Sequence, residues 1–260
     1  MTLAATVERL AAGEVAAKPT RAVLLRVYRH NPSTPGDTPK IVTYRVPVSF
    51  GMTVLDALIW AKEHVDPSLA FRCSCRMGIC GSCGMQINGV PRLGCETQLT
   101  ELGGDRVDVA PLANHPIVRD LATDFTGFFG KHRAVRPHVV RTDGEPAKIE
   151  REFLQTEEQK LAYYQFTMCI MCGLCNSACP IATMDAKFLG PQALAQAYRF
   201  TADSRDQGGD ARLPVLEDHH GVWRCEIAGS CSAVCPKGVD PALGIQLLKR
   251  TLIGRRLGRA

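Results

Sequence analysis

The sequence predicts an α+β fold, with a small mixed sheet in the first part of the chain and helices in the second. Three observations lead to this prediction. Short apolar, β-branched segments recur between residues 21 and 112, whereas residues 151–260 show the helical spacing of apolar side chains. Twelve cysteines fall into three tight groups, one in the first part and two in the second. A chain of 260 residues suffices for two domains.

The first domain, residues 21–112, is predicted as a β-grasp arrangement of one helix on a mixed sheet. Thr53 is a suitable N-cap for a helix over residues 54–65. A hairpin is expected to turn at Asn88 and Gly89, because this dipeptide favours two-residue turns between strands. The strands and the hairpin are predicted at residues 22–30, 40–48, 85–93 and 106–110.

The second domain, residues 151–260, is predicted to be all-α. Pro191 marks one helix start, because the first helical position needs no backbone N–H. Residues 113–150 are rich in Pro, His and Arg and are predicted as a connector, and residues 1–20 as an N-terminal extension. The helices are expected at residues 152–166, 191–200 and 241–257.

Composition narrows the class of protein. The first twenty residues include Glu8, Arg9 and Glu14 and contain no apolar core, so no signal peptide is expected. No apolar run reaches the roughly 18 residues of a membrane span. Clustered thiols in a reducing cytoplasm are typical of metal ligands. The net charge of +5 is mild and dispersed, which argues against nucleic-acid binding and fits docking to acidic protein or lipid surfaces.

The first cysteine group has the plant-type [2Fe–2S] spacing, C-x4-C-x2-C with a later fourth cysteine. Its members are Cys75, Cys80, Cys83 and Cys95. Gly78, Gly81 and Gly84 would let the loop turn its N–H groups towards the sulfurs, and Arg76 would add positive charge. Cys73 lies outside the spacing and is predicted as a partly buried small side chain. The alternative, a zinc knuckle, usually needs two C-x2-C pairs or histidines, and one pair is present here.

The second group matches the bacterial run C-x2-C-x2-C-x3-C-P, in which the fourth cysteine ligates the other of two clusters. Its first three cysteines are therefore expected to take their fourth ligand from the third group and to complete a [4Fe–4S] cluster. This ligand set is Cys169, Cys172, Cys175 and Cys235. The exchange requires residues 169–180 to lie beside residues 225–236, so the helical domain would be one unit.

The remaining thiols are one short of a full set. Cys179, Cys225 and Cys231 are left for the second cluster, and Ala228 stands where a complete run would carry a cysteine. Three thiolates suit a [3Fe–4S] cluster, and a [4Fe–4S] cluster with water or another side chain on one iron is the alternative. Several clusters in one chain indicate an electron conductor without catalytic residues of its own. A non-redox protein with structural zinc is a further alternative.

The cysteine groups and the phrases between them resemble the iron–sulfur subunit of succinate dehydrogenases and fumarate reductases over about residues 20–250. The phrases are FRCSCRMGICGSCG, NGVPRLGC, CIMCGLCNSACP, KFLGPQALAQAYRF, DSRDQG and GVWRCEIAGSCSAVCPKGVDPA. Their detail leans towards bacterial fumarate reductases and menaquinone-linked relatives. The resemblance implies a plant-ferredoxin-like domain and a bacterial two-cluster ferredoxin-like domain. It also implies succinate:quinone oxidoreductase activity for a complex whose dicarboxylate site lies outside this chain.

The resemblance also implies partners. A flavoprotein subunit with covalent FAD would carry the dicarboxylate site. A membrane anchor, often with haem b, would hold this chain at the cytoplasmic face of the bacterial cell membrane. In that family the [2Fe–2S] cluster lies near the flavin and the [3Fe–4S] cluster near the quinone. The chain would then pass single electrons between two-electron carriers, in either physiological direction.

Two departures from ubiquinone-linked members concern the quinone. Those members usually carry Trp where this chain has Met184 and His where it has Glu226. Gln246 and Lys249 match positions near menaquinone in fumarate reductases, so menaquinone is the expected quinone. For Lys249 the alternative is a basic, solvated helix face. For the whole chain the alternative is an iron–sulfur subunit of a related soluble or non-quinone oxidoreductase.

Other conspicuous residues are not expected to take part. His115, His132 and His138 lack ligand spacing and are predicted as surface or interface residues. Trp60 and Trp223 are predicted as core residues.

Overall fold

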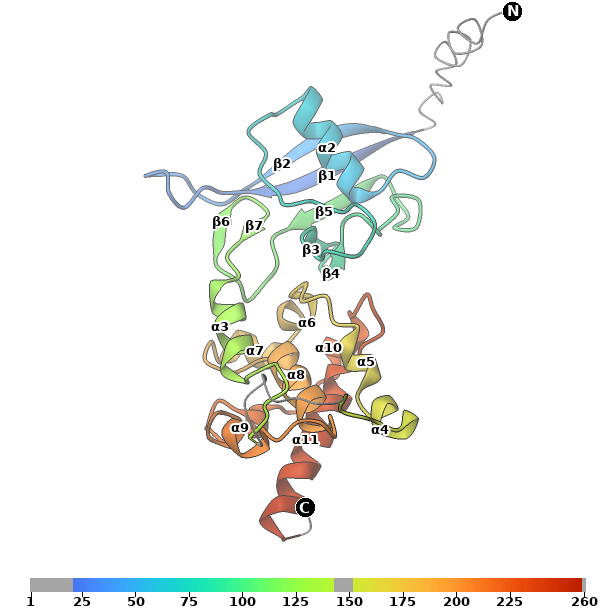
Figure 1. The fold of residues 1–260 in the computed structure, drawn as a ribbon. Helices are drawn as coiled ribbons and strands as arrows, with labels where there is room; N and C mark the ends of the chain where they lie inside the picture. The colour runs from blue at the N-terminus through green and yellow to red at the C-terminus, as the bar shows by residue number, and fades with distance from the viewer. Residues whose placement is uncertain (1–20, 143–151, 259–260) are drawn as a thin grey trace, which may run out of the picture.

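The computed structural model describes residues 21–142 and 152–258. A sheet domain and a helical domain follow one another along the chain and meet at a narrow waist (Figure 1). The α+β class, with a sheet domain first and a helical domain second, is confirmed. The predicted N-terminal extension, residues 1–20, lies outside the described residues. No helix of the described part is long and apolar enough to cross a membrane.

The main sheet has five strands whose order is that of a β-grasp fold. They are β1 (Arg21–Arg29), β2 (Lys40–Val48), β3 (Gly84–Ile87), β4 (Val90–Leu93) and β5 (Arg106–Ala110). The spatial order is β2-β1-β5-β3-β4, with β1 and β5 parallel and the other neighbours antiparallel. Alternate side chains of β1, Val23, Leu25 and Val27, are fully buried, as expected for a strand with a core face.

Local signals explain the other elements of the sheet domain. Helix α2 (Val54–His64) starts at the predicted cap: the Thr53 hydroxyl accepts from the Asp56 N–H, and the Asp56 carboxylate accepts from the Thr53 N–H. The β3–β4 hairpin turns at Asn88 and Gly89, which have φ of 49° and 77°. Positive φ at both residues suits the right-handed twist of the strands.

The segment predicted as a connector, residues 113–150, contains two short strands and a helix among its described residues. β6 (Ile117–Arg119) and β7 (Ala122–Thr123) form a second sheet, and α3 (Thr126–Ala134) follows. Buried Asp120 fastens the small sheet to the first domain, because its carboxylate accepts from the backbone N–H groups of His30 and Ala70 at 3.0 and 2.9 Å.

The helical domain is built around α8 and α11, which pack against each other. Leu194 of α8 and Ile245 and Leu248 of α11 are fully buried there. Both helices begin with a proline at the first turn. The helices are α4 (Glu157–Leu161), α5 (Tyr164–Thr167), α6 (Leu174–Ser177), α7 (Pro180–Met184), α8 (Pro191–Thr201), α9 (Gly209–Leu216), the 3-10 helix η2 (Val222–Arg224), α10 (Ser230–Ala233) and α11 (Pro241–Arg256).

The predicted helix over residues 152–166 is wrong in its extent. Residues 152–156 are not helical, because Thr156 caps α4 through a reciprocal pair of hydrogen bonds with Gln159. The chain then breaks at Tyr163, which has non-helical backbone angles and donates its hydroxyl to Gln155 at 2.7 Å. Tertiary contacts of a buried tyrosine therefore override the helical periodicity.

Candidate iron–sulfur sites

The first cysteine loop surrounds its sulfurs with backbone N–H groups. The Cys75 sulfur accepts from the N–H groups of Ile79 and Cys80 at 3.3 and 3.2 Å. The N–H of Gly78 lies 3.3 Å from the Cys95 sulfur. Gly78 has a φ of +69°, which glycine adopts without strain. Successive inward N–H dipoles create a positive potential, which suits thiolates and an anionic cluster.

The thiols of this loop differ in their proton affinity. The Ser82 hydroxyl, 3.0 Å from the Cys80 sulfur, and the Cys75 N–H lower the pKa of Cys80 to about 6. Burial raises the pKa of Cys83 to about 12, and the neighbouring Cys95 and Cys80 thiols add to this rise. Iron binding must therefore displace a proton from Cys83, whereas Cys80 offers a thiolate at neutral pH.

Four thiols of the helical domain line one cavity. They are Cys169, Cys172, Cys175 and Cys235. Burial raises the pKa of Cys175 well above its ordinary value, with further contributions from the neighbouring thiols. Burial likewise raises the pKa of Cys172 to about 11. A dry cavity with four soft sulfur donors fits a cubane iron–sulfur cluster.

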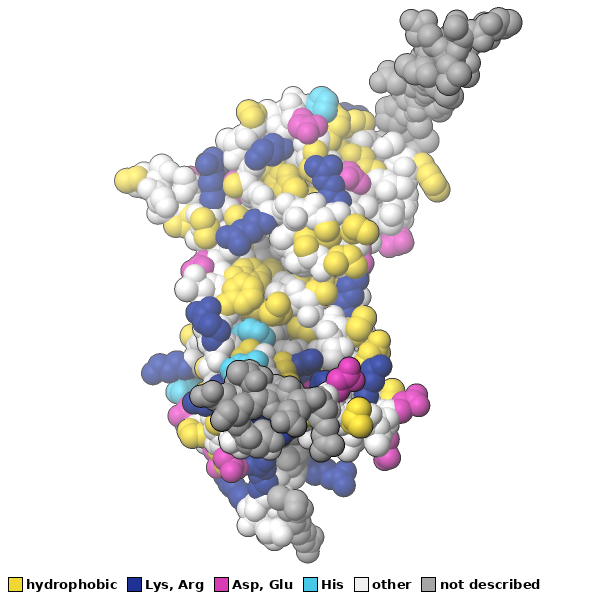
Figure 2. Space-filling view, viewed as in Figure 1, with side chains coloured by type: hydrophobic (Ala, Val, Ile, Leu, Met, Phe, Trp, Pro, Cys, Tyr) yellow, Lys and Arg dark blue, Asp and Glu magenta, His cyan; other side chains and the backbone are white. Residues whose placement is uncertain are grey.

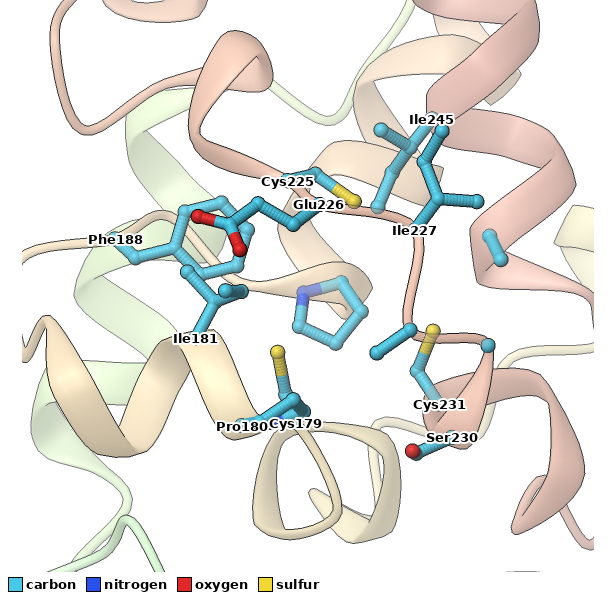
Figure 3. A pocket seen from close by; sticks show the side chains of 14 residues that line it. Cys179, Pro180, Ile181, Phe188, Cys225, Glu226, Ile227, Ser230, Cys231 and Ile245 are labelled. Atoms are coloured by element: carbon cyan, nitrogen blue, oxygen red, sulfur yellow. The ribbon is translucent and has the colours of Figure 1, made fainter.

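A second cavity is lined by the other three thiols. The side chains of Cys179, Cys225 and Cys231 reach it from three sides (Figure 3). Ala228 lines the same cavity, so the position that lacks a cysteine in the sequence faces the site itself. The rest of the wall is mostly apolar and includes Ile181, Phe188, Ile227 and Ile245. Three thiolates in this setting fit a three-iron cluster.

The two C-terminal cysteine groups use the same local device. Gly173 and Gly229, with φ of +78° and +74°, each precede a four-residue helix. The second residue of each helix is a cysteine, Cys175 in α6 and Cys231 in α10. The left-handed glycine lets the chain reverse abruptly into the helix, which brings both thiols to the centre of the domain.

The spacing of the thiols bears on the zinc alternative. Among residues 21–142 and 152–258, no three His, Cys, Asp or Glu side chains are grouped as they would be around one metal ion. The thiols of the helical domain instead line two pockets, four in one and three in the other, as the two-cluster iron–sulfur pattern requires. This geometry favours iron–sulfur clusters over a tetrahedral zinc ion.

Sequence reasoning missed a buried polar side chain at the four-thiol cavity. Gln192 of α8 is 3% exposed and lines this cavity. Its amide nitrogen lies 3.1 Å from His132 Nδ1. Burial raises the pKa of Cys169, and a hydrogen bond from Gln192 opposes this rise. The amphipathic pattern of α8 gave no signal for this role, because Gln192 is 17 residues from the nearest cysteine of its site in sequence.

The sequence also missed the supports of α6. Asn114 donates to the carbonyls of Asn176 and Cys179 at 2.8 and 3.2 Å. His115 is buried and stacks on Phe125 with ring centroids 4.5 Å apart, so the prediction of a surface position for it is wrong. Asn114 and His115 can be recognised as supports of α6 only in the folded structure, because they lie far from α6 in the sequence.

Two further predictions are corrected. Cys73 is exposed rather than partly buried, because the chain enters the cluster loop along the surface and only Cys75 turns inward. Trp223 is 37% exposed rather than in the core, and the charged groups of Lys249 and Arg256 lie 6.0 and 5.4 Å from its ring. Its ring serves as a platform for cations.

Two family models match the chain. Residues 24–130 match a 2Fe-2S iron-sulfur cluster binding domain, and residues 165–239 match a 4Fe-4S dicluster domain. The fold and the three groups of thiols therefore define a protein that joins a [2Fe–2S] domain to a two-cluster domain.

Curated relatives narrow this class. The fumarate reductase iron-sulfur subunit of Mycobacterium tuberculosis is 46% identical over 229 residues, 88% of this chain and 92% of the relative. The succinate dehydrogenase iron-sulfur subunit of Paracoccus denitrificans is 39% identical over 252 residues, 95% of each chain. A chain of the Mycobacterium smegmatis Sdh1 complex in the apo form superposes with a TM-score of 0.74 at 28% identity and covers 91% of this chain and 97% of its own. The chain belongs to the succinate dehydrogenase/fumarate reductase family, as its iron–sulfur electron-transfer subunit.

Proposed function

We propose that this chain relays single electrons between the FAD of a flavoprotein subunit and a quinone bound at a membrane anchor. The observation that carries the proposal is the sorting of seven C-terminal thiols into two cavities, four in one and three in the other. The same division follows from cysteine spacing alone. Bound clusters would supply one-electron chemistry, which is what a chain between two two-electron carriers requires.

The proposed ligand sets follow the cavities and the first loop. The [2Fe–2S] set is Cys75, Cys80, Cys83 and Cys95; the [4Fe–4S] set is Cys169, Cys172, Cys175 and Cys235; the [3Fe–4S] set is Cys179, Cys225 and Cys231. The positions of the sites support an electron path from the [2Fe–2S] set through the [4Fe–4S] set to the [3Fe–4S] set. Gly81 of the first loop abuts Cys172, and Cys175 lies close enough to Cys231 for their charges to interact. The protein holds the ligands, excludes water and supplies hydrogen bonds that stabilise negative charge.

The quinone is proposed to bind near the three-thiol cavity, with menaquinone favoured. Two features support Lys249 and Gln246 as residues of that region. The Lys249 ammonium donates to the Cys225 carbonyl at 2.8 Å, which brings a positive charge to the site. The Gln246 amide nitrogen is buried without a hydrogen-bond partner among the described residues, so it has a donor to offer. Met184 and Glu226 replace the residues typical of ubiquinone-linked members.

We further propose that a flavoprotein and an anchor, with haem b on the anchor where present, complete the complex at the cytoplasmic face of the bacterial membrane. Family membership supports this assembly. Figure 2 shows Lys and Arg side chains gathered around the end of the molecule where α11 lies, and Arg255 and Arg256 stand in the last turn of that helix. Such a surface suits anionic headgroups or an acidic partner.

The test is a redox titration of the anaerobically purified complex, followed by electron paramagnetic resonance (EPR). We expect a [3Fe–4S] signal in the oxidised sample and a [2Fe–2S] signal on reduction. Cys235→Ser should damage the [4Fe–4S] signal and spare the [2Fe–2S] signal, and Cys80→Ser should do the reverse. Loss of the same cluster in both variants, or the lack of a [3Fe–4S] signal at every potential, would contradict the ligand sets. Purification without a membrane subunit would favour the soluble alternative.

A further inference from the structure

The loops of two different domains meet where the first and second cysteine groups face each other. Gly81 lies between Cys80 and Cys83, and a Cβ atom added to it would stand 2.7 Å from the Cβ and 2.9 Å from the Cα of Cys172. Real Cβ atoms essentially never approach so closely. The backbone of the [2Fe–2S] loop therefore touches a [4Fe–4S] ligand because position 81 has no side chain.

Gly84 repeats this arrangement at the start of β3. A Cβ there would lie 3.2 Å from the Cys172 carbonyl oxygen and 3.3 Å from the Leu174 side chain. Unlike Gly81, which has a φ of +73°, Gly84 does not have a left-handed backbone conformation. Turn geometry therefore gives no reason for a glycine at position 84, whereas the close approach of the second loop does.

The contact is fixed by packing across the domain boundary. Leu174, two residues after Cys172, is fully buried and belongs to the core of the sheet domain. Ile170 and Val234 from the helical domain also pack against that core. Figure 1 shows α6 directly below the β3–β4 hairpin at the waist of the molecule. An apolar anchor of this kind resists the relative motion that is usual between domains.

An ion pair joins the last ligands of the two sites. Glu96 follows Cys95, and its carboxylate lies 3.5 Å from the ammonium of Lys237, two residues after Cys235. The Glu96 side chain lies over Gly78, where an added Cβ would clash with it at 1.8 Å. The carboxylate is thus held in place by the cluster loop as well as by the lysine.

We propose that this junction sets the electron-transfer distance between the two domains, with Gly81 and Gly84 as positioning residues and the Glu96–Lys237 pair as the link between the loops. The proposal rests on the proposed function, because it assumes the two ligand sets. The step it serves moves one electron: one site is oxidised, the next is reduced, and no bond or proton moves. The rate of electron tunnelling falls steeply with distance. Because the two glycines have no side chains, the cysteine loops can touch, and the short distance favours fast electron transfer between their clusters.

The test measures the separation of the two clusters rather than turnover. In the reduced complex both clusters are paramagnetic, and the [4Fe–4S] spin speeds the spin relaxation of the [2Fe–2S] signal by a dipolar interaction that falls with the inverse cube of distance. We expect Gly84→Ala and Gly84→Val to retain both signals and to weaken this relaxation enhancement progressively. Lys237→Met, at a partly exposed position, should weaken it without disturbing the packed core.

Gly51→Ala is the matched control, because Gly51 has a φ of +77° and open space around its Cβ position. Gly51→Ala introduces the same kind of backbone strain as Gly81→Ala but does not disturb the contact between the two loops. We therefore expect the relaxation enhancement to be unchanged in Gly51→Ala and weakened in Gly81→Ala. Unchanged relaxation in Gly84→Val and Lys237→Met, with both signals present, would overturn the junction proposal alone. Absence of both signals from the unaltered complex would instead contradict the proposed function, and the junction with it.

Discussion

At the scale of the residue, the four-thiol site is more than its ligands. Gln192 brings a polar amide into an otherwise closed cavity and hydrogen-bonds the Cys169 thiol. Hydrogen bonds to ligand sulfurs stabilise the more negative, reduced form of a cluster and so raise its reduction potential. We therefore expect Gln192 to help set the reduction potential of the cluster in this site.

Replacing this amide should change the potential of one cluster. We expect Gln192→Leu to lower the reduction potential of the [4Fe–4S] cluster in an EPR-monitored redox titration and to leave the [2Fe–2S] potential unchanged. Gln196→Leu is the control, because Gln196 lies one turn later on α8, is also buried and donates to the Phe166 carbonyl instead of a thiol. Equal shifts in the two variants would rule out a specific role for Gln192.

The apo chain should show one thiol that reacts at unusually low pH. Cys80 is exposed and has a pKa of about 6, set first by the Ser82 hydroxyl. The thiolate is the reactive form, so alkylation of Cys80 should rise through pH 6, whereas an ordinary thiol is activated near pH 9. Mass spectrometry of iodoacetamide-treated apo protein across pH measures this. Ser82→Ala should move the midpoint upwards, and a midpoint near pH 9 in the unaltered chain would count against the assigned hydrogen bonds.

Residue identity explains which parts of the sites the sequence predicted. The division of thiols between the cavities was predictable because a two-cluster run has a fixed cysteine spacing and its last cysteine ligates the other cluster. Gln192, Asn114 and His115 act from other elements, and no spacing rule links them to the thiols. Cys73 shares the residue type of its neighbours without their environment, which explains the wrong prediction of its burial.

At the scale of the element, the shortest helices depend on partners outside themselves. α6 has four residues, far fewer than an isolated helix needs, so contacts with other segments must stabilise it. Asn114, in the segment that follows the sheet domain, supplies an additional donor to the Asn176 carbonyl at 2.8 Å and accepts from the Thr183 hydroxyl of α7 at 3.0 Å. One side chain thus joins the start of the connector to both short helices beside Cys179.

Removing this cap should weaken the three-thiol site. Asn114 has a φ of +62°, so Asn114→Gly keeps the backbone conformation and removes only the hydrogen bonds. We expect a loss of roughly 1 kcal/mol of stability and a broadened or diminished [3Fe–4S] signal in EPR. Asn88→Gly, at a φ of 49° in the β3–β4 turn, provides the control. An unaffected [3Fe–4S] signal in Asn114→Gly would show that the cap does not position Cys179.

Elements with strong local signals were predictable and the others were not. α2, α8 and α11 have caps or prolines at their starts and sustained apolar faces, and the hairpin has its Asn-Gly turn. α6 and α10 are single turns formed by the geometry of the cysteine loops, and β6 and β7 are only three and two residues long. Their formation depends on tertiary contacts, so no local pattern announces them.

At the scale of the whole molecule, the two domains differ in what stabilises them. The sheet domain has a continuous apolar core formed by its strands and α2. Around the cavities of the helical domain, short helices bring together segments about sixty residues apart, and burial raises the pKa of Cys175 between them well above its ordinary value. Cluster binding there contributes directly to folding.

Removal of iron should therefore loosen the two domains unequally. We expect amide hydrogen exchange, measured by mass spectrometry on the loaded and the chelator-stripped protein, to lose protection in α6 and α10 and to retain it in β1 and β5. Edge strand β2 serves as an internal reference, because it lies farthest from the cysteine loop in the sheet order. Similar protection in α6 and α10 with and without iron would show that packing alone stabilises the helical domain.

The pairing of Cys235 with thiols 60 to 66 positions earlier also has a consequence for biosynthesis. As the chain leaves the ribosome, all four thiols of the first loop are available once residue 95 has emerged. Neither cavity of the helical domain can close until residues 231 and 235 have followed, shortly before α11 is made. Maturation would then run from the first domain to the second, with iron delivered to the helical domain only after its last cysteine has emerged.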